Sequence, residues 1–373
     1  MNKKLSLTIS DYHIKKYNQL NPHLSDWEVT MYYYTNQQIV KAIKKYKPYR
    51  VNLLGDIFDS IPSNIELFIL KDLISLIRNI DMIEYKGKDI EIFCINGNHT
   101  LLPNQQNKTY YKGLLKDFFK KEYNINVLEY EEVKTPYHKN PFLYCSHGSI
   151  NRLETLTKNY SAVFSHFRSS NPKDKAIYSD EIDTTILKAK ADLVVLGDIH
   201  TRLNYDNVVY CGSPICTVFH DKEDLPSILI LNEETLKWEW VDTIKDIYNK
   251  KVVQFTETDD MTYILDKMKE LEEDSNKFKS FYKVKIVNTK SFISSLKLEQ
   301  FKHFCIVEPT YTDMKVVDVE QKEIMEIIKE ANISNIGTEL DFESYVHENN
   351  SRKELTDKVK MTLNFIKGGI FND

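Results

Sequence analysis

The first two-thirds of the chain alternates short apolar runs with longer segments of helical spacing. The apolar runs predict strands at residues 5–10, 50–54, 90–95, 142–145, 162–165, 193–196, 208–211 and 227–231. Apolar positions three and four apart predict helices at residues 29–45, 63–80 and 110–121. Strands that alternate with helices indicate a layered α/β domain built on a central sheet.

A second α/β unit and a charged helical tail follow. The pattern predicts strand, helix, strand, helix and strand at residues 252–255, 261–273, 281–287, 291–304 and 305–311. Helices are expected in the tail at residues 321–331, 341–347 and 352–366. We therefore expect three domains, which span residues 1–245, 250–320 and 321–373.

Composition limits the classes of protein that fit. A chain of 373 residues is too long for one ordinary domain. Its net charge of −5 excludes a globally basic nucleic-acid binder but not a local basic surface. Five cysteines without a C-x-x-C pair indicate a reducing compartment. The N-terminal residues are typical of a first strand and not of a signal peptide, and no apolar run reaches membrane-spanning length.

Acidic, amide and imidazole side chains follow the ends of the predicted strands. The runs are Asp11-Tyr12-His13, Gly55-Asp56-Ile57-Phe58-Asp59, Gly97-Asn98-His99, His166 and Gly197-Asp198-Ile199-His200. Strand ends are where an α/β scaffold presents ligands. These ligand types together can hold two divalent cations side by side, which is the equipment for hydrolysing a phosphate ester.

Each run also has a plainer interpretation. The D-x-H run can be a solvated turn. An aspartate just past an apolar strand needs a cation or hydrogen bonds, because an unpaired charge there is costly. The alternative for this residue type is a helix N-cap, which suits Asp59 or Ser60 better than Asp56.

Two further positions depend on local geometry. Asp198 and His200 stand two residues apart, so on an extended segment both side chains point the same way. His166 directly ends a predicted strand, and a lone histidine there is often structural. His147, in Cys145-Ser146-His147-Gly148, is its competitor as a metal ligand.

In order and combination, these runs resemble the calcineurin-type metallophosphoesterases. More narrowly, they resemble the SbcD-type nuclease subunit of the SbcCD and double-strand-break-repair complex family, including its phage forms. The resemblance implies an α/β fold: a layered β-sandwich flanked by helices, a small α/β capping domain and a helical C-terminal tail. It also implies two Mn²⁺ ions, with Mg²⁺ as the alternative.

The resemblance assigns roles to the residues of these runs. One cation would be bound by Asp11, His13, Asp56 and His200. The other would be bound by Asp56, Asn98, His166 and Asp198, so that Asp56 bridges the pair. His99 would be the catalytic acid beside the leaving oxygen. The distance from His166 to the run at residues 197–200 fits the family better than that of His147.

The chain departs from the family at two positions. Asp198 stands where the family usually has histidine, and its extra negative charge should tighten cation binding and raise the pKa of metal-bound water. Thr100 stands where the family usually has an acidic residue that orients the catalytic histidine. His99 would then need another partner, for which Asp59 is the candidate.

The leading hypothesis is a metal-dependent DNA exonuclease and endonuclease subunit in recombination, repair or replication. The resemblance implies an SbcC-like coiled-coil ATPase partner docked on the tail, a homodimer, and a cytoplasmic location (the host cytoplasm for a phage protein). Candidate phosphate contacts flank the metal runs, at Lys15, Lys16, Arg168 and Arg202. Two alternatives stay open: a stand-alone nucleotide phosphodiesterase that needs neither cap nor tail, and a scaffold that clamps DNA with little or no cleavage.

Overall fold

The computed structural model describes residues 2–59, 64–83, 90–99, 119–121, 123–169, 184–219, 225–244 and 247–312. Contacts divide the chain into two units. The first comprises Met1–Ile286 with Leu296–Pro309, and the second comprises Val287–Ser295 with Thr310–Asp373. The three-domain division expected from the sequence stays a prediction. Its tail helices, and all of residues 321–373, lie outside the described residues, as does most of the predicted helix at 110–121.

The first sheet has six strands in the order β12-β11-β1-β2-β3-β4. These are β1 (Asn2–Ile9), β2 (Pro48–Leu54), β3 (Glu91–Ile95), β4 (Asn126–Val127), β11 (Ser227–Asn232) and β12 (Lys237–Asp242). Strands β1, β2 and β3 run parallel, so their carboxyl ends lie at one edge of the sheet.

The second sheet also has six strands, in the order β5-β6-β7-β8-β10-β9. These are β5 (Tyr130–Val133), β6 (Phe142–Cys145), β7 (Tyr160–His166), β8 (Ala191–Gly197), β9 (Leu203–Tyr205) and β10 (Val208–Tyr210). Strands β6, β7, β8 and β10 run parallel. Parallel strands buried on both faces explain the continuous apolar run of β8.

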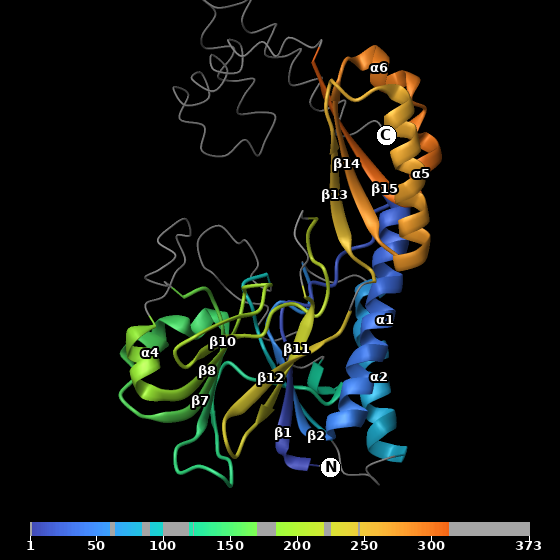
Figure 1. Cartoon of the computed structure of the whole chain (residues 1–373). Helices are drawn as coiled ribbons and strands as arrows, with labels where there is room; N and C mark the ends of the chain where they lie inside the picture. Colours follow the sequence, from blue (N-terminus) through green and yellow to red (C-terminus); the bar gives the residue numbers. More distant parts are fainter. Residues whose placement is uncertain are drawn as a thin grey trace, which may run out of the picture. The chain divides into compact units, whose positions relative to one another are not determined.

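The two sheets pack face to face and helices cover their outer faces (Figure 1). Alternate residues of one strand enter different layers: Phe164 packs between the sheets, whereas Val163 packs toward α4 (Thr185–Lys190) and the 3₁₀ helix η1 (His147–Thr155). The rings of Tyr144 and Phe164 stack between the sheets with centroids 4.7 Å apart. The predicted α/β fold of layered sheets flanked by helices is confirmed.

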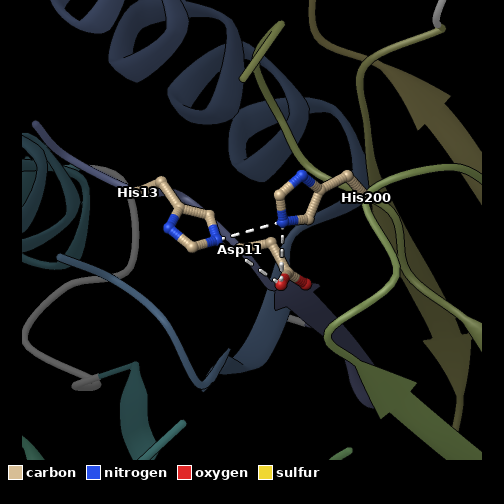
Figure 2. A group of neighbouring side chains, drawn as sticks. All are labelled: Asp11, His13 and His200. Carbon is tan, nitrogen blue, oxygen red and sulfur yellow. Dashed lines mark hydrogen bonds and ion pairs between the residues drawn. The ribbon is translucent and has the colours of Figure 1, made fainter. Parts of the chain in front are cut away.

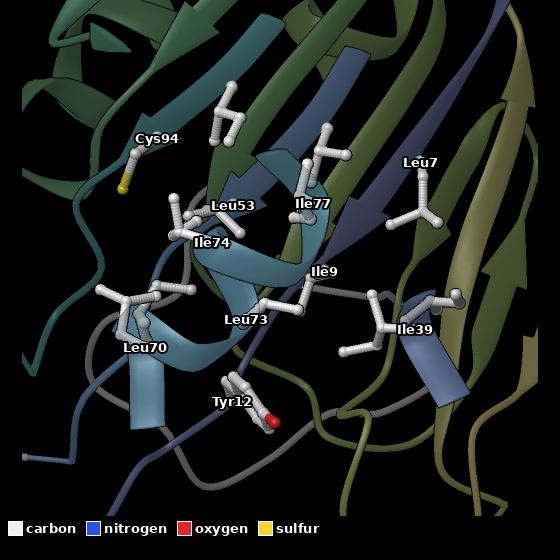
Figure 3. Packing of buried hydrophobic residues seen from close by; sticks show 14 of the residues in the cluster. Leu7, Ile9, Tyr12, Ile39, Leu53, Leu70, Leu73, Ile74, Ile77 and Cys94 are labelled. Carbon is white, nitrogen blue, oxygen red and sulfur yellow. The ribbon is translucent and has the colours of Figure 1, made fainter. Parts of the chain in front are cut away.

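Helices α1 (Pro22–Tyr46) and α2 (Asn64–Ile83) bury one face against the first sheet (Figure 3). Ile39 of α1 and Leu73 of α2 are fully buried there, and each such side chain contributes about 1.5–3 kcal/mol. The sequence predicted that α1 begins at residue 29. It begins earlier because Pro22 suits the first turn of a helix, and it ends at the left-handed Lys47.

A third sheet, in the order β13-β14-β15, follows the two larger ones. It consists of β13 (Lys250–Phe255), β14 (Phe281–Asn288) and β15 (Cys305–Tyr311), with α5 (Met261–Phe278) between β13 and β14. Asp260 caps α5 by accepting a hydrogen bond from the N–H of Tyr263.

The predicted helix at 291–304 is wrong as a single element. It is divided into α6 (Lys290–Ser295) and the 3₁₀ helix η2 (Leu298–Phe301), because Lys297 adopts a left-handed conformation with φ of 48°. Leu296 and Phe301 are both buried, so apolar positions recur with helical spacing although the backbone is interrupted. Among the described helices, none has the length and apolarity needed to cross a membrane.

Candidate metal centre

The predicted metal ligands gather at the carboxyl edge shared by the two large sheets. Asp11 and His13 follow β1, Asp56 follows β2, His166 ends β7, and His200 follows β8. Hydrogen bonds join the loops: the N–H of His13 donates to Asp56 O (2.8 Å) and the N–H of Asp11 donates to Gly55 O (3.3 Å). The sheet edge therefore brings together residues from strands far apart in the sequence.

The backbone is strained where it presents these side chains. Asp11, His13, Asp56 and Asp198 have φ values of 53°, 44°, 44° and 85°. A non-glycine residue at positive φ is uncommon and costs on the order of 1 kcal/mol or more. The expectation of an extended segment through Asp198 is therefore wrong. Such strain persists only where surrounding contacts fix it, which is typical of a functional site.

Asp11, His13 and His200 form the first group of converging ligand atoms (Figure 2). The two Nε2 atoms of His13 and His200 lie 3.1 Å apart, and Asp11 Oδ1 lies 3.8 and 3.7 Å from them. Two imidazole nitrogens and a carboxylate oxygen facing one point are a ligand set for a divalent cation.

Asp11, Asp56 and His166 form a second group, fully buried. His166 Nε2 lies 3.0 Å from Asp56 Oδ2 and 3.9 Å from Asp11 Oδ1. Asp56 Oδ2 also lies 3.8 Å from His13 Nε2, so this one oxygen faces ligands of both groups. That position suits the bridging role expected for Asp56.

Three buried atoms on predicted metal ligands lack a hydrogen-bond partner: Asp56 Oδ2, His166 Nε2 and Asn98 Oδ1. Asp56 Oδ2 and His166 Nε2 face each other without the geometry of a hydrogen bond. An unsatisfied buried polar atom costs about 1–3 kcal/mol. Three such atoms on predicted ligands are explained if they bind cations, so the residues present fit a two-metal centre.

The other ring nitrogen of each histidine is already engaged. Nδ1–H of His166 donates to Leu54 O (2.8 Å), and Nδ1–H of His13 donates to the Asp59 carboxylate (3.2 Å). His200 Nδ1 lies 2.7 Å from Thr217 Oγ1. Hydrogen bonds at Nδ1 fix the tautomer that presents Nε2 as a metal ligand.

The electrostatics describe a cluster without its cations. Burial lowers the pKa of a histidine, but the charges of Asp56 and Asp11 outweigh burial and raise the pKa of His166 to about 10. Burial would raise the pKa of Asp56, yet the adjacent His166 holds it well below its usual range. For His200, burial outweighs the nearby carboxylates and lowers the pKa.

His99 lies at the rim of the cluster, with its side chain 40% exposed. Its backbone N–H donates to Asp56 Oδ1 (3.0 Å), and its Nδ1–H donates to Asp59 O (2.9 Å). Nε2 is left on the metal side, 4.0 Å from Asp56 Oδ2. The Asp59 carboxylate lies closer to His13 than to His99, at 3.2 against 3.8 Å, and the three residues form a third group of converging ligand atoms.

Asp198 lies beside the cluster, but its carboxylate also pairs with the side chain of Arg168. Its Oδ1 lies 3.9 Å from His166 Nε2, while its Oδ2 pairs with Arg168 Nε at 3.1 Å. Its backbone N–H donates to Asp11, at 3.1 Å from each carboxylate oxygen. Arg168 offsets the negative charge that we expected Asp198 to add.

The remaining candidates lie away from the converging atoms. His147 donates from Nδ1 to His166 O (2.9 Å), and within the described part of the chain it joins none of the three ligand groups. Arg202 pairs with Asp242 and with Pro226 O, which turns it from the cluster. Thr100 lies outside the described residues.

Sequence reasoning missed two supporting groups. Ser10 Oγ donates to Asp11 Oδ2 (2.6 Å) and Thr217 supports His200. Ser10 stands next to a predicted ligand and could have been inferred from that position. Thr217 lies in a loop with no pattern of its own, and only the fold brings it to His200.

Comparison with known protein families agrees with this geometry. The model of a family described as calcineurin-like phosphoesterase matches residues 7–229. A solved structure of a novel archaeal phosphodiesterase is similar over 64% of this chain and 99% of its own, with 14% sequence identity and a TM-score of 0.33. No curated protein matches the chain.

Proposed function

The chain belongs to the calcineurin-like phosphoesterase family, and from this membership we propose that it is a divalent-metal-dependent DNA nuclease. The family assignment makes it a hydrolase of phosphoester bonds that uses divalent metal ions. The observation that carries the proposal is the convergence of ligand atoms on Asp11, Asp56 and His166 beside those on Asp11, His13 and His200. Mn²⁺ is the proposed metal, because the resemblance to the SbcD-type nucleases implies it and the carboxylate and amide oxygens suit it.

Two bound cations would supply Lewis-acid polarisation of the phosphate and activation of water. Asp11, His13 and His200 would hold one, and Asp56, Asn98 and His166 would complete the other, with Asp198 Oδ1 in reach. Asp59 O accepts from His99 Nδ1–H and so directs Nε2 toward the reaction site. A proton on this Nε2 can pass to the leaving sugar oxygen, which is the role of a general acid.

DNA as the substrate, and an SbcC-like ATPase as the partner, extend the proposal beyond the family. Two features support DNA: the order of the motifs, which resembles the SbcD-type nucleases, and the third sheet of β13, β14 and β15, which could hold a duplex. We propose that residues 321–373 bind the ATPase and that the nuclease works as a homodimer.

Cleavage assays separate the candidates. We expect Mn²⁺-dependent cleavage of labelled duplex DNA, lost in Asp56→Asn and retained in His23→Ala, a control histidine at the exposed start of α1. Hydrolysis of mononucleotide esters without cleavage of DNA would replace the nuclease with a nucleotide phosphodiesterase. Duplex binding without hydrolysis of any ester would indicate a DNA-clamping scaffold.

A further inference from the structure

Thr217 connects a predicted metal ligand to the interior of the first unit. Its Oγ1 lies 2.7 Å from His200 Nδ1, and its backbone oxygen accepts a hydrogen bond from Lys15 Nζ (3.0 Å). The residue is 3% exposed. A buried hydroxyl that lies against the outer nitrogen of a metal-facing imidazole is placed to set the orientation of that ring.

The loop that carries Thr217 continues into a contact with the third sheet. The ring of Phe219 lies 6.5 Å from that of Phe281 in β14, and Lys250 Nζ of β13 lies 5.6 Å from the Phe219 ring centroid. Only one residue separates the side chain that supports His200 from the side chain that meets the sheet. A displacement of the third sheet can therefore reach the metal centre through a short stretch of backbone between Phe219 and Thr217.

A buried ion pair joins α1 to β13 beside the contact between Phe219 and the third sheet. Lys250 Nζ lies 2.5 Å from Glu28 Oε1 of α1, and both side chains are largely excluded from water. Lys15 Nζ lies 4.0 Å from the same Glu28 oxygen. Because separating a buried pair leaves an uncompensated charge, the pair resists relative movement of α1 and β13.

Trp27 of α1 also contacts β14 and the residues just before it. Trp27 Nε1–H donates to Lys279 O (2.6 Å), and its ring lies 5.7 Å from that of Phe281. The contacts of Glu28 and Trp27 thus attach α1 to both β13 and the segment before β14. The third sheet is therefore held against the same helix whose Glu28 lies 4.0 Å from Lys15 Nζ.

We propose that Thr217 is a positioning residue for His200, and that the Lys250–Glu28 pair seats the Thr217 loop against the third sheet. The placement of that sheet then sets the metal affinity of the group formed by Asp11, His13 and His200. The inference rests on the metal centre of the proposed function but is independent of which ester is cleaved.

Substitution of Thr217 tests the first step. Thr217→Val keeps the shape of the side chain and removes the hydrogen-bond acceptor, so Mn²⁺ should bind about 10–100-fold more weakly at one of its sites. Thr217→Ser keeps the hydroxyl and should restore most of the affinity. Both are measured by calorimetric Mn²⁺ titration of the full chain, with thermal unfolding of the metal-free protein as the folding control. Unchanged affinity in Thr217→Val, or an equal loss in Thr217→Ser, overturns the positioning role.

A remote substitution tests the second step. The double variant Lys250→Met with Glu28→Gln removes both buried charges together, which avoids leaving one unpaired. Its Mn²⁺ affinity should fall about 10-fold, at the lower end of effects transmitted through supporting residues. Lys251→Met is the matched control, because Lys251 stands next along β13 and pairs with Asp274 Oδ2 at 3.0 Å.

The outcomes are separable. Wild-type affinity in the double variant, or an equal loss in Lys251→Met, overturns the coupling of the sheet to the metal centre. A chain that binds Mn²⁺ normally but cleaves no DNA contradicts the proposed function and leaves the coupling intact.

Discussion

Gly97 offers a sharp test of how closely the metal centre is packed. It follows β3 and lies against Asp56, the carboxylate that faces both ligand groups. A Cβ at this position would lie 2.6 Å from Asp56 Cγ and 2.6 Å from Asp56 N. The backbone of Gly97 is not left-handed, so Gly97→Ala perturbs the site by steric contact and not by backbone strain.

The size of the effect follows from the overlap. Carbon atoms pack best at about 3.5–4.0 Å, so Asp56 or its loop must move by roughly 1 Å. Misplacement by 1 Å can cost about 100-fold in rate. That factor corresponds to about 2.7 kcal/mol in the activation barrier. The N–H of His99 donates to Asp56 Oδ1, so the same movement also displaces the candidate proton donor.

The assay is steady-state hydrolysis of a chromogenic phosphodiester over a full Mn²⁺ titration. We expect kcat of Gly97→Ala to fall about 100-fold and to stay low at saturating metal, because added metal does not return Asp56 to its position. Thermal unfolding of the metal-free variant reports whether the fold is kept. Wild-type kcat at saturating Mn²⁺ in a folded variant would refute the reasoning.

Three further predictions concern the ligands and the proton donor. His99→Ala should keep Mn²⁺ affinity and lose about 10²–10⁴-fold in cleavage, as measured by calorimetry and turnover on the same sample. Asp56→Asn should lose both metal affinity and cleavage, and normal Mn²⁺ binding in this variant would contradict the bridging position. The pKa of His166 is raised to about 10 from its usual 6.5, so its stabilising interaction is fully present below pH 6.5 and is lost as the pH rises toward 10. Thermal unfolding should therefore show that metal-free stability falls over that range while stabilisation by Mn²⁺ grows, and a flat profile would contradict the assignment.

The sequence predicted the place of the site better than its inner contacts. Polar residues after strand ends could be grouped because parallel strands of one sheet end at the same edge. Asp11, His13, Asp56, His166 and His200 do converge there. Their roles as ligands stay predictions. The approach of His166 and His200 to Asp11 and Asp56 comes from the packing of the second sheet on the first, which the apolar pattern does not contain.

Contacts that depend on loops could not be predicted. The pairing of Arg168 with Asp198 joins residues that follow different strands, and the pattern gives no partner for either. Arg202 was, like Arg168, a candidate phosphate contact, yet it pairs with Asp242 on β12. Charge type alone cannot distinguish a side chain that binds substrate from one that neutralises a neighbour.

The features that suit the centre for binding metal are unfavourable for the stability of the metal-free protein. Asp11 and Asp56 are buried together, both at positive φ, and Asp56 Oδ2 is unsatisfied. Each of these features is unfavourable in the metal-free protein. The buried layers on both faces of the sheets hold them in place, because movement of the strand ends would disrupt the packing between the sheets.

Bound cations would make the free-energy contribution of these same features favourable. A ligand that binds only the folded state stabilises it by about 2.7 kcal/mol at one hundred times its Kd. Divalent charge placed between the oxygens of Asp11 and Asp56 would attract both carboxylates. Asp11→Asn should therefore weaken the stabilisation that Mn²⁺ gives in thermal unfolding. A gain from Mn²⁺ equal to that of the wild type would show that Asp11 serves the fold and not a metal centre.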